Sequence, residues 1–258
     1  MNPPMASEFT KYETRGAYHW EEIGQRWTPR YSARLHALYS WFVDEVKARR
    51  PALVIDVGCG DAALTDRMAR ATPGGRVVGI EPEPSGVEFA QGALVAAQSP
   101  AEVILGRGEE LPFETGTAGL VTMCEVVEHI ADVGPLVREA ARVLAPGGAL
   151  LVSTPQWQRP ELRPFHVREY RGTELAHMLG EHFGRVRVQA SEPGRLQDLY
   201  LTSTPTRIAV NLLSQAGMNP FRVRRSPTDA RAGWRQLVAV AEAPVFSANS
   251  STRGPLRS

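Results

Sequence analysis

The stretch VIDVGCGDA, residues 54–62, decides the fold. A short apolar run ends in an acid, Asp56, and continues directly into Gly58-Cys59-Gly60. Glycines let the backbone turn sharply and let a ligand approach more closely than any side chain would allow. In open α/β sheets, ligands bind at the carboxyl ends of the strands, which is where this turn must lie. The stretch therefore predicts a strand, a turn that faces a ligand, and a helix.

A second acid lies at the end of the next apolar run, VVGIEPE (77–83). Glu81 stands about twenty residues beyond the glycines, where a carboxylate can accept hydrogen bonds from both hydroxyls of a ribose. Together with the glycine turn it predicts a nucleotide-type ligand. The pattern Gly58-x-Gly60-x-x-Ala63 followed by Glu81 also satisfies the loose dinucleotide fingerprint. An NAD-dependent oxidoreductase is therefore one alternative.

Further apolar runs extend this unit into a sheet. Runs that are apolar on both faces suit parallel strands, because helices cover both sides of such a sheet. Between the runs, residues 132–144 carry one apolar stripe at helical spacing and are followed by APGG. Strands that alternate with helices predict an α/β, doubly wound, Rossmann-like sheet. The predicted strands are 52–55, 77–80, 103–105, 120–124 and 149–153.

The ends of the chain are organised differently from this core. We expect a helical segment over residues 1–50, of which about the first 15 are disordered, and a disordered tail at 245–258. The core domain is expected over 51–244. It would contain a helix at 172–183, a strand at 184–190 and a last strand at 235–243, with an insertion at about 191–234. The insertion has two readings, a cap over the site or a cover for the sheet edge.

Composition excludes several classes of function. The formal net charge is +1, from 29 basic and 28 acidic residues, so no global basic field favours nucleic acid. Two cysteines cannot form a disulfide framework, and they suit a reducing compartment. No apolar run reaches the ~18 residues that a membrane span needs. The polar N-terminus lacks a signal peptide's apolar core, so we expect a cytoplasmic protein.

Five motifs follow one another along the chain: IDVGCGDAALT, VVGIEP, GEELPF (108–113), MCEVVEHI and VLAPGGALLVSTP. Taken as a set, they resemble the motifs of class I S-adenosylmethionine-dependent methyltransferases. The resemblance covers roughly residues 50–185, and it is similar in particular to ubiquinone-biosynthesis O-methyltransferases and bacterial small-molecule or sugar methyltransferases. It implies S-adenosylmethionine as the cofactor and a seven-stranded, mostly parallel sheet with an antiparallel last strand.

The resemblance also implies the residues that hold the cofactor. Asp56, Gly58 and Gly60 would surround its methionine part, and the charge of Asp56 suits an ammonium and a sulfonium. Glu81 would bind the ribose, and Pro82 would lie against the adenine. The backbone at Gly108 and Glu109 would lie beside the adenine, and the carbonyl of Cys124 would meet the cofactor's amino group. Arg107 departs from the pattern, because it stands where the family usually has an acid for the adenine amino group.

The stretch CEVVEHI (124–130) holds the residues nearest the expected chemistry. If a helix begins at once, Glu125, Glu128 and His129 share one face at the mouth of the sheet. These side chains could bind a divalent ion (Mg, Mn or Zn) together with His166 in PFHVREY. Small-RNA 2′-hydroxyl methyltransferases bind metal through a related arrangement. Alternatively, His129 is a general base supported by Glu128, or the acids only supply charge to the start of a helix.

The acid–histidine cluster favours oxygen as the methyl acceptor, because a hydroxyl of high pKa needs a base or a metal. We therefore predict O-methylation of a small-molecule or glycan hydroxyl. An RNA 2′-hydroxyl methyltransferase is a further alternative, which the near-zero net charge disfavours. The aromatic group Tyr18, His19 and Trp20 in GAYHWEE could close over the cofactor, or Trp20 could pack in the core.

Overall fold

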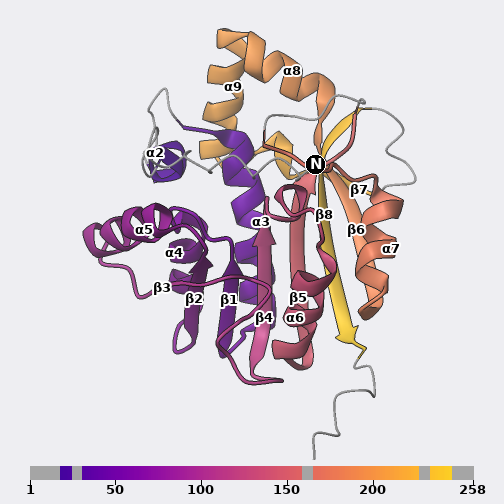
Figure 1. Cartoon of the computed structure of the whole chain (residues 1–258). Helices are drawn as coiled ribbons and strands as arrows, with labels where there is room; N and C mark the ends of the chain where they lie inside the picture. The colour runs from indigo at the N-terminus through magenta and orange to yellow at the C-terminus, as the bar shows by residue number, and fades with distance from the viewer. Residues whose placement is uncertain (1–17, 25–30, 159–164, 227–232, 246–258) are drawn as a thin grey trace, which may run out of the picture.

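The computed structural model describes residues 18–24, 31–158, 165–226 and 233–245. Within these ranges the chain forms one eight-stranded sheet in the order β3-β2-β1-β4-β5-β8-β6-β7 (Figure 1). The predicted disordered ends fall mostly outside the described residues. The strands are β1 Leu53–Val57, β2 Arg76–Glu81, β3 Glu102–Leu105, β4 Ala118–Cys124, β5 Leu144–Pro155, β6 Phe183–Pro193, β7 Arg224–Arg225 and β8 Trp234–Pro244.

The direction of the strands confirms the predicted fold class. Strands β1 to β5 pair in parallel, and β8 lies antiparallel between β5 and β6. Seven strands match the expected number, and the eighth is β7, a two-residue strand that pairs with the end of β6. Two residues are too few for any apolar alternation to be read from a sequence. The predicted last strand is β8, in the predicted antiparallel direction.

Alternation along the strands places a helical layer on each face of the sheet. In β1, Ile55 and Val57 pack in the cluster that α6 and α7 cover, whereas Val54 packs in the cluster that α3 and α4 cover. Parallel strands need apolar side chains on both faces for this reason. The helices of these layers are α3 Ala33–Arg49, α4 Ala63–Arg70, α5 Pro84–Ala96, α6 Gly134–Val143 and α7 Gly172–Gly180.

The insertion forms two helices that lie beyond the carboxyl ends of the parallel strands (Figure 1). These are α8 Gly194–Thr202 and α9 Thr204–Gln215, followed by the short helix η2 Pro220–Arg222. Their apolar contacts are with the start of α3, where Tyr200, Val210 and Phe221 pack against Tyr31 and Ala37. The insertion thus lies over the end of the sheet that carries the predicted site, while β7 extends the sheet edge.

No helix in the described part of the chain is both long and apolar enough to cross a membrane.

Candidate functional site

The glycine turn lies at the carboxyl end of β1, as predicted. Gly58 and Gly60 have φ angles of 67° and 57°, in the left-handed region that favours glycine. A Cβ atom on Gly58 would also lie 2.7 Å from a methyl group of Val126, so the turn packs directly against the segment after β4. The N–H groups of Gly58 and Cys59 donate to the carbonyl of Ile80, at 2.8 and 3.1 Å. These bonds fix the turn against β2.

Glu81 ends β2 beside this turn. Its side chain accepts hydrogen bonds from the backbone N–H groups of Gly60 (2.9 Å) and Glu83 (3.2 Å). Burial raises the pKa of Glu81, and the two backbone hydrogen bonds partly offset that shift. The carboxylate is therefore held in one orientation at the edge of the sheet. Each of its oxygens keeps further acceptor capacity for a ligand hydroxyl.

Asp56 lies behind the turn, on the α4 side of the sheet. It is 1% exposed, and its two oxygens accept hydrogen bonds from Thr65 and Thr122, both at 2.7 Å. Burial raises its pKa to about 6, although both threonine hydrogen bonds lower it. The side chain is thus enclosed by other protein atoms and does not contact the space beyond the turn. Any effect on a ligand at the turn would act through charge at a distance.

The loop after β3 lies next to Glu81, since the N–H of Gly106 donates to the Glu81 carbonyl at 3.0 Å. A Cβ atom on Gly108 would lie 2.3 Å from Leu136 and 2.5 Å from Val57, so this backbone packs closely over β1. Arg107, which stands where the family usually has an acid, is 73% exposed and pairs with Glu109 at 3.3 Å. The backbone of the loop, rather than the Arg107 side chain, lies close to the sheet.

Sequence reasoning missed Asp61, which links the glycine turn to the N-terminal helix α2 (Tyr18–Gly24). Asp61 is 1% exposed, and its carboxylate accepts from the backbone N–H of His19 at 3.0 Å and contacts the His19 ring at 3.1 Å. The indole of Trp20 donates to the Asp61 carbonyl at 2.7 Å. Trp20 also packs against two apolar clusters. Trp20 thus packs in the core as one reading expected, and closure over the cofactor stays a prediction. The only sequence signal for Asp61 was an acid next to the glycines.

The two cysteines are free thiols at the ends of β1 and β4. Burial raises the pKa of both thiols well above the usual value, and the charge of nearby acids, Asp56 for Cys59 and Glu125 for Cys124, raises it further. Thiols held in the neutral form are poor nucleophiles. Cys59 and Cys124 are packing residues, in keeping with the sequence.

The expected helix directly after β4 is wrong. Glu125 has a φ angle of 57°, a left-handed conformation that interrupts a helix, and only a single short turn, η1 Val127–His129, follows. The next helix, α6, begins at Gly134. Glu125, Glu128 and His129 therefore do not share one helical face. The three residues have the spacing of one helical face in the sequence, but the backbone there does not form an α-helix.

Glu125 turns toward β5 and β8. Its Oε1 atom accepts hydrogen bonds from Ser153 and Gln236. Burial raises the pKa of Glu125, and the charge of Glu192 raises it further, whereas the two hydrogen bonds and Arg34 lower it. Arg34 itself pairs with Glu192 at 2.8 Å. The structure thus separates Glu125 from the predicted metal group and places it in a second polar network.

Glu128, His129 and His166 come together. One ligand atom from each lies within 4.8 Å of the others, although His166 stands 37 residues beyond His129. His129 Nδ1 lies 2.8 Å from the carbonyl of Phe165, and His166 Nδ1 lies 3.0 Å from Glu169. Glu128 is fully buried and accepts from Thr154 at 3.0 Å. Three of the four predicted metal ligands therefore form one group.

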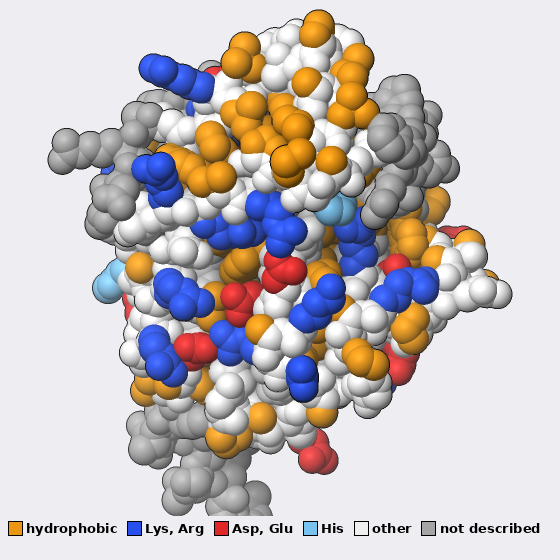
Figure 2. Space-filling view, turned by 180° about the vertical axis from the view of Figure 1, so that it is seen from behind, with side chains coloured by type: hydrophobic (Ala, Val, Ile, Leu, Met, Phe, Trp, Pro, Cys, Tyr) orange, Lys and Arg blue, Asp and Glu red, His pale blue; other side chains and the backbone are white. Residues whose placement is uncertain are grey.

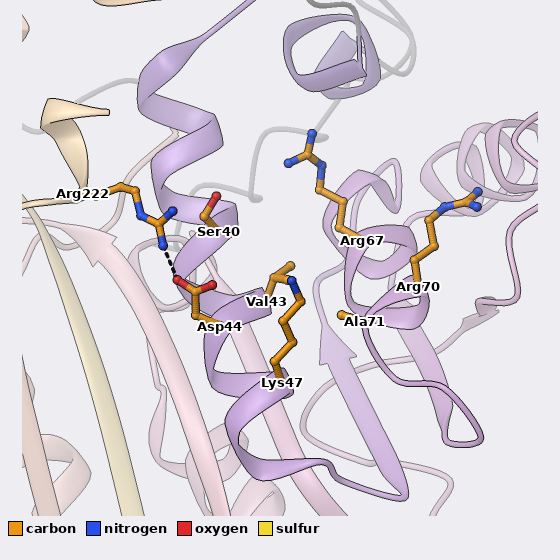
Figure 3. A pocket seen from close by; sticks show the side chains of 8 residues that line it. All are labelled: Ser40, Val43, Asp44, Lys47, Arg67, Arg70, Ala71 and Arg222. Atoms are coloured by element: carbon orange, nitrogen blue, oxygen red, sulfur yellow. Dashed lines mark hydrogen bonds and ion pairs between the residues drawn. The ribbon is translucent and has the colours of Figure 1, made fainter. Parts of the chain in front are cut away.

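A hollow of about 350 Å³ lies elsewhere, between α3, α4 and η2 (Figure 3). Its lining includes Asp44 and the cations Lys47, Arg67, Arg70 and Arg222. It contains none of the predicted site residues. The candidate site is the strand edge and not this hollow.

Comparisons with known proteins match the part of the chain that forms this strand edge. Residues 55–152 match the family model described as a methyltransferase domain. The ubiquinone biosynthesis O-methyltransferase of Azorhizobium caulinodans is 31% identical over 163 residues, which are 57% of this chain and 61% of that protein. The chain thus spans about 60% of the length of that relative.

Solved structures show the same fold at low identity. The phosphoethanolamine N-methyltransferase 2 of Haemonchus contortus matches with a TM-score of 0.60 and 16% identity, over 89% of this chain and 56% of that one. The [4+2]-cyclase SpnF matches with a TM-score of 0.58 and 16% identity, over 86% and 88%. One fold therefore carries different chemistries.

The architecture, a mostly parallel Rossmann-like sheet with a glycine turn at its carboxyl edge, is that of the class I methyltransferases. With the match at residues 55–152, this part of the chain is a methyltransferase domain of that architecture.

Proposed function

We propose that this protein transfers a methyl group from S-adenosylmethionine to a hydroxyl group of a small molecule or glycan. The observation that carries the proposal is the domain match over the glycine turn and the strands around it. The match favours methyl transfer over the NAD-dependent oxidoreductase that the glycine turn alone left open. Hydroxyl acceptors are supported by the ubiquinone biosynthesis O-methyltransferase relative and by the Glu128–His129–His166 group.

The cofactor half of the site comprises the glycine turn, Glu81 and the loop after β3. These residues fit the cofactor: the left-handed glycine turn lies at the carboxyl end of β1, and Glu81 beside it is a fixed acceptor for the ribose hydroxyls. Gly58 and Gly60 would hold the methionine part, with the Cys124 carbonyl near its amino group and Asp56 behind the turn. Pro82 and the backbone at Gly108 and Glu109 would line the adenine.

The acceptor half of the site comprises Glu128, His129 and His166. The cofactor supplies an electrophilic methyl group on a sulfonium, and placing the acceptor oxygen in line with it lowers the barrier. A carbonyl can only accept a hydrogen bond, so the contact with Phe165 places a proton on His129 Nδ1. The basic lone pair is then on Nε2, where His129 can take the proton of the acceptor hydroxyl. Glu128 lies beside it as a counter-charge.

A divalent ion is the second candidate for the same group. Two imidazoles and a carboxylate form a set of ligands that suits a borderline ion such as Zn or Mn. Each imidazole has its Nδ1 atom held, by a carbonyl or by Glu169, as in many metal sites where the other nitrogen is the ligand. Glu128, His129 and His166 would then hold the ion, which would acidify an acceptor hydroxyl.

Two measurements test the proposal. Isothermal titration with S-adenosylhomocysteine and with NAD should show binding of S-adenosylhomocysteine alone; binding of NAD alone would overturn the methyltransferase assignment. Transfer of labelled methyl groups from S-adenosylmethionine to a panel of catechols, sugars and amines should then favour hydroxyl acceptors. Preference for an amine would leave methyl transfer standing and remove the O-methyltransferase assignment. Retained activity after exhaustive chelation would favour His129 as a base.

A further inference from the structure

Helix α9 buries two polar side chains together with Val210, and it presents several large apolar side chains to solvent. Its inward side contains Asn211 and Ser214, which are buried. Asn211 accepts from the Tyr200 hydroxyl at 2.8 Å and donates to the Tyr31 carbonyl at 2.9 Å, and the Ser214 hydroxyl lies 2.8 Å from that of Tyr31. These hydrogen bonds fix which side of the helix faces out. A surface helix normally turns its large apolar side chains toward the core.

The outward side of α9 joins other exposed apolar side chains into one surface. Ile208, Leu212 and Leu213 are 54%, 45% and 42% exposed on α9, and Leu199 and Leu201 are 54% and 58% exposed on α8. We call this surface, together with Met218 and Val223, the apolar face. Figure 2 shows hydrophobic side chains gathered at the top of the molecule, where α8 and α9 lie. Exposed apolar surface of this extent is typical of an interaction site.

The segment that carries most of the apolar face contains arginines and no acids, although Asp198 directly precedes it and Asp44 of α3 lies beside Arg222. From Leu199 to Ser226 the sequence contains no Asp or Glu but four arginines, Arg207, Arg222, Arg224 and Arg225. Arg222 pairs with Asp44 of α3, and Arg224 lies over the ring of Trp41. Burial lowers the pKa of Arg224 to about 10, so it remains a cation at neutral pH. Figure 2 shows further Lys and Arg side chains below the face, interspersed with Asp and Glu. Arg222 also borders the hollow of Figure 3.

Two occupants could cover the apolar face, a second copy of the chain or a lipid surface, and the basic groups favour one of them. A second copy docked through the same face would bring two sets of arginines together, because a twofold interface repeats one patch on both subunits. Anionic lipid instead offers an apolar layer for the leucines and negative headgroups for the arginines. We propose that the apolar face docks on an anionic lipid surface, with α9 lying in the plane of the interface. The proposal is independent of the methyl acceptor.

Vesicle co-sedimentation of the full chain tests this assignment. Vesicles of phosphatidylcholine with one-third phosphatidylglycerol should bind the protein at least about tenfold more tightly than pure phosphatidylcholine, and added salt should weaken the binding. The double variant L212S/L213S should bind at least about tenfold more weakly, because burial of apolar area drives insertion. The double variant R207Q/R225Q should bind the anionic vesicles more weakly and should bind pure phosphatidylcholine vesicles as the unchanged protein does.

Matched controls separate the apolar face from general stickiness. Val95 is 80% exposed on α5, and Arg138 is exposed on α6, so V95S and R138Q should bind as the unchanged protein does. Circular dichroism should show that every variant is folded. Absence of vesicle binding, or binding that L212S/L213S leaves unchanged, would overturn the proposal. A dimer in light scattering that L212S/L213S converts to a monomer, without vesicle binding, would assign the face to a second copy.

Discussion

The cofactor half and the acceptor half of the site lie along the same edge of the sheet but are assembled differently. In the cofactor half, Glu81 accepts from Gly60, 21 residues away, and from its near neighbour Glu83. In the acceptor half, His129 meets Phe165 across 36 residues, and His166 joins His129 from 37 residues further along the chain. The first half depends on adjacent strand–turn–helix units. The second depends on where the later parts of the chain come to lie.

This difference has a chemical consequence. Every class I domain must hold the same cofactor, which local motifs can do, whereas the acceptor differs from protein to protein. The match to a [4+2]-cyclase on the same fold illustrates how far chemistry can diverge while the sheet is kept. Variants in the two halves should therefore separate cofactor binding from the rate of methyl transfer.

The largest effect is expected from His129 in the acceptor half. The variant H129N should lower kcat for methyl transfer by about 10²-fold, the range typical for loss of a general base. Its affinity for S-adenosylhomocysteine should change by less than about twofold, because His129 lies outside the cofactor contacts that we propose. Single-turnover transfer of labelled methyl and isothermal titration measure the two quantities.

The matched control is H177N, since the His177 side chain is 84% exposed on α7. It should leave both quantities unchanged. An H129N enzyme with full kcat would remove His129 as a base, and a parallel loss of cofactor affinity would contradict the division into two halves.

Glu81 should show the reverse pattern. The variant E81A removes an acceptor for the ribose and for the N–H groups of Gly60 and Glu83. Hydrogen bonds to charged groups contribute about 1.5–3 kcal/mol each, so S-adenosylhomocysteine should bind roughly 10–100-fold more weakly. With saturating cofactor, kcat should recover in large part. The exposed Glu88 on α5 supplies the control E88A, and equal effects of the two variants on affinity would argue against a ribose contact.

The sheet and the cofactor half were predictable because each signal is local. VIDVGCGDA predicted a strand, a glycine turn and a helix after it, and Glu81 followed at a fixed place at the end of β2. The antiparallel position of β8 followed from the family resemblance. Asp61 escaped notice because its contact with α2 joins two segments about forty residues apart.

For the acceptor half, the sequence indicated which residues take part but not how they are arranged. The spacing of Glu125, Glu128 and His129 fitted a helix, but the left-handed φ angle of Glu125 directs its side chain to Ser153 and Gln236 instead. That outcome depends on hydrogen-bond partners in β5 and β8, which no local pattern reveals. His166 was a predicted neighbour of His129, and its place there depends on the loop after β5. The outward leucines of α9 were likewise not predicted, since the insertion was expected only as a cap over the site or a cover for the sheet edge.

A third prediction tests whether the acceptor half binds a divalent ion. If Glu128, His129 and His166 hold a divalent ion, Zn or Mn should raise the melting temperature of the unchanged protein in proportion to its affinity. The variant H166N should lose most of that shift while E125Q keeps it, because Glu125 lies in the separate network with Ser153 and Gln236. Differential scanning calorimetry with and without chelator measures the shift. Equal losses in H166N and E125Q would return Glu125 to the metal group.

Asp56 offers a smaller effect, on stability rather than binding. Its folded pKa of about 6 lies above the unfolded value, so its ionisation destabilises the folded protein as the pH rises through 6. Between pH 5 and pH 7.5 this amounts to about 1.4 kcal/mol, the value of one pKa unit. The variant D56N has no carboxyl group to titrate at this position. From pH 5 to pH 7.5, its free energy of unfolding should therefore rise by about that amount relative to the free energy of the unchanged protein. Urea unfolding at both pH values checks the difference, and parallel pH profiles would show that Asp56 titrates normally.

Arg107 should give the smallest effect, and it tests the one departure of the cofactor half from the family pattern. Because its side chain is 73% exposed and its only described charge partner is Glu109, R107A should change the affinity for S-adenosylhomocysteine by less than about threefold. The variant R107D restores an acid at the position where the family usually binds the adenine amino group. It should strengthen binding by a few-fold if the loop backbone already holds the ring as we propose. A large loss of affinity in R107A would mean that the arginine itself has taken over the adenine contact.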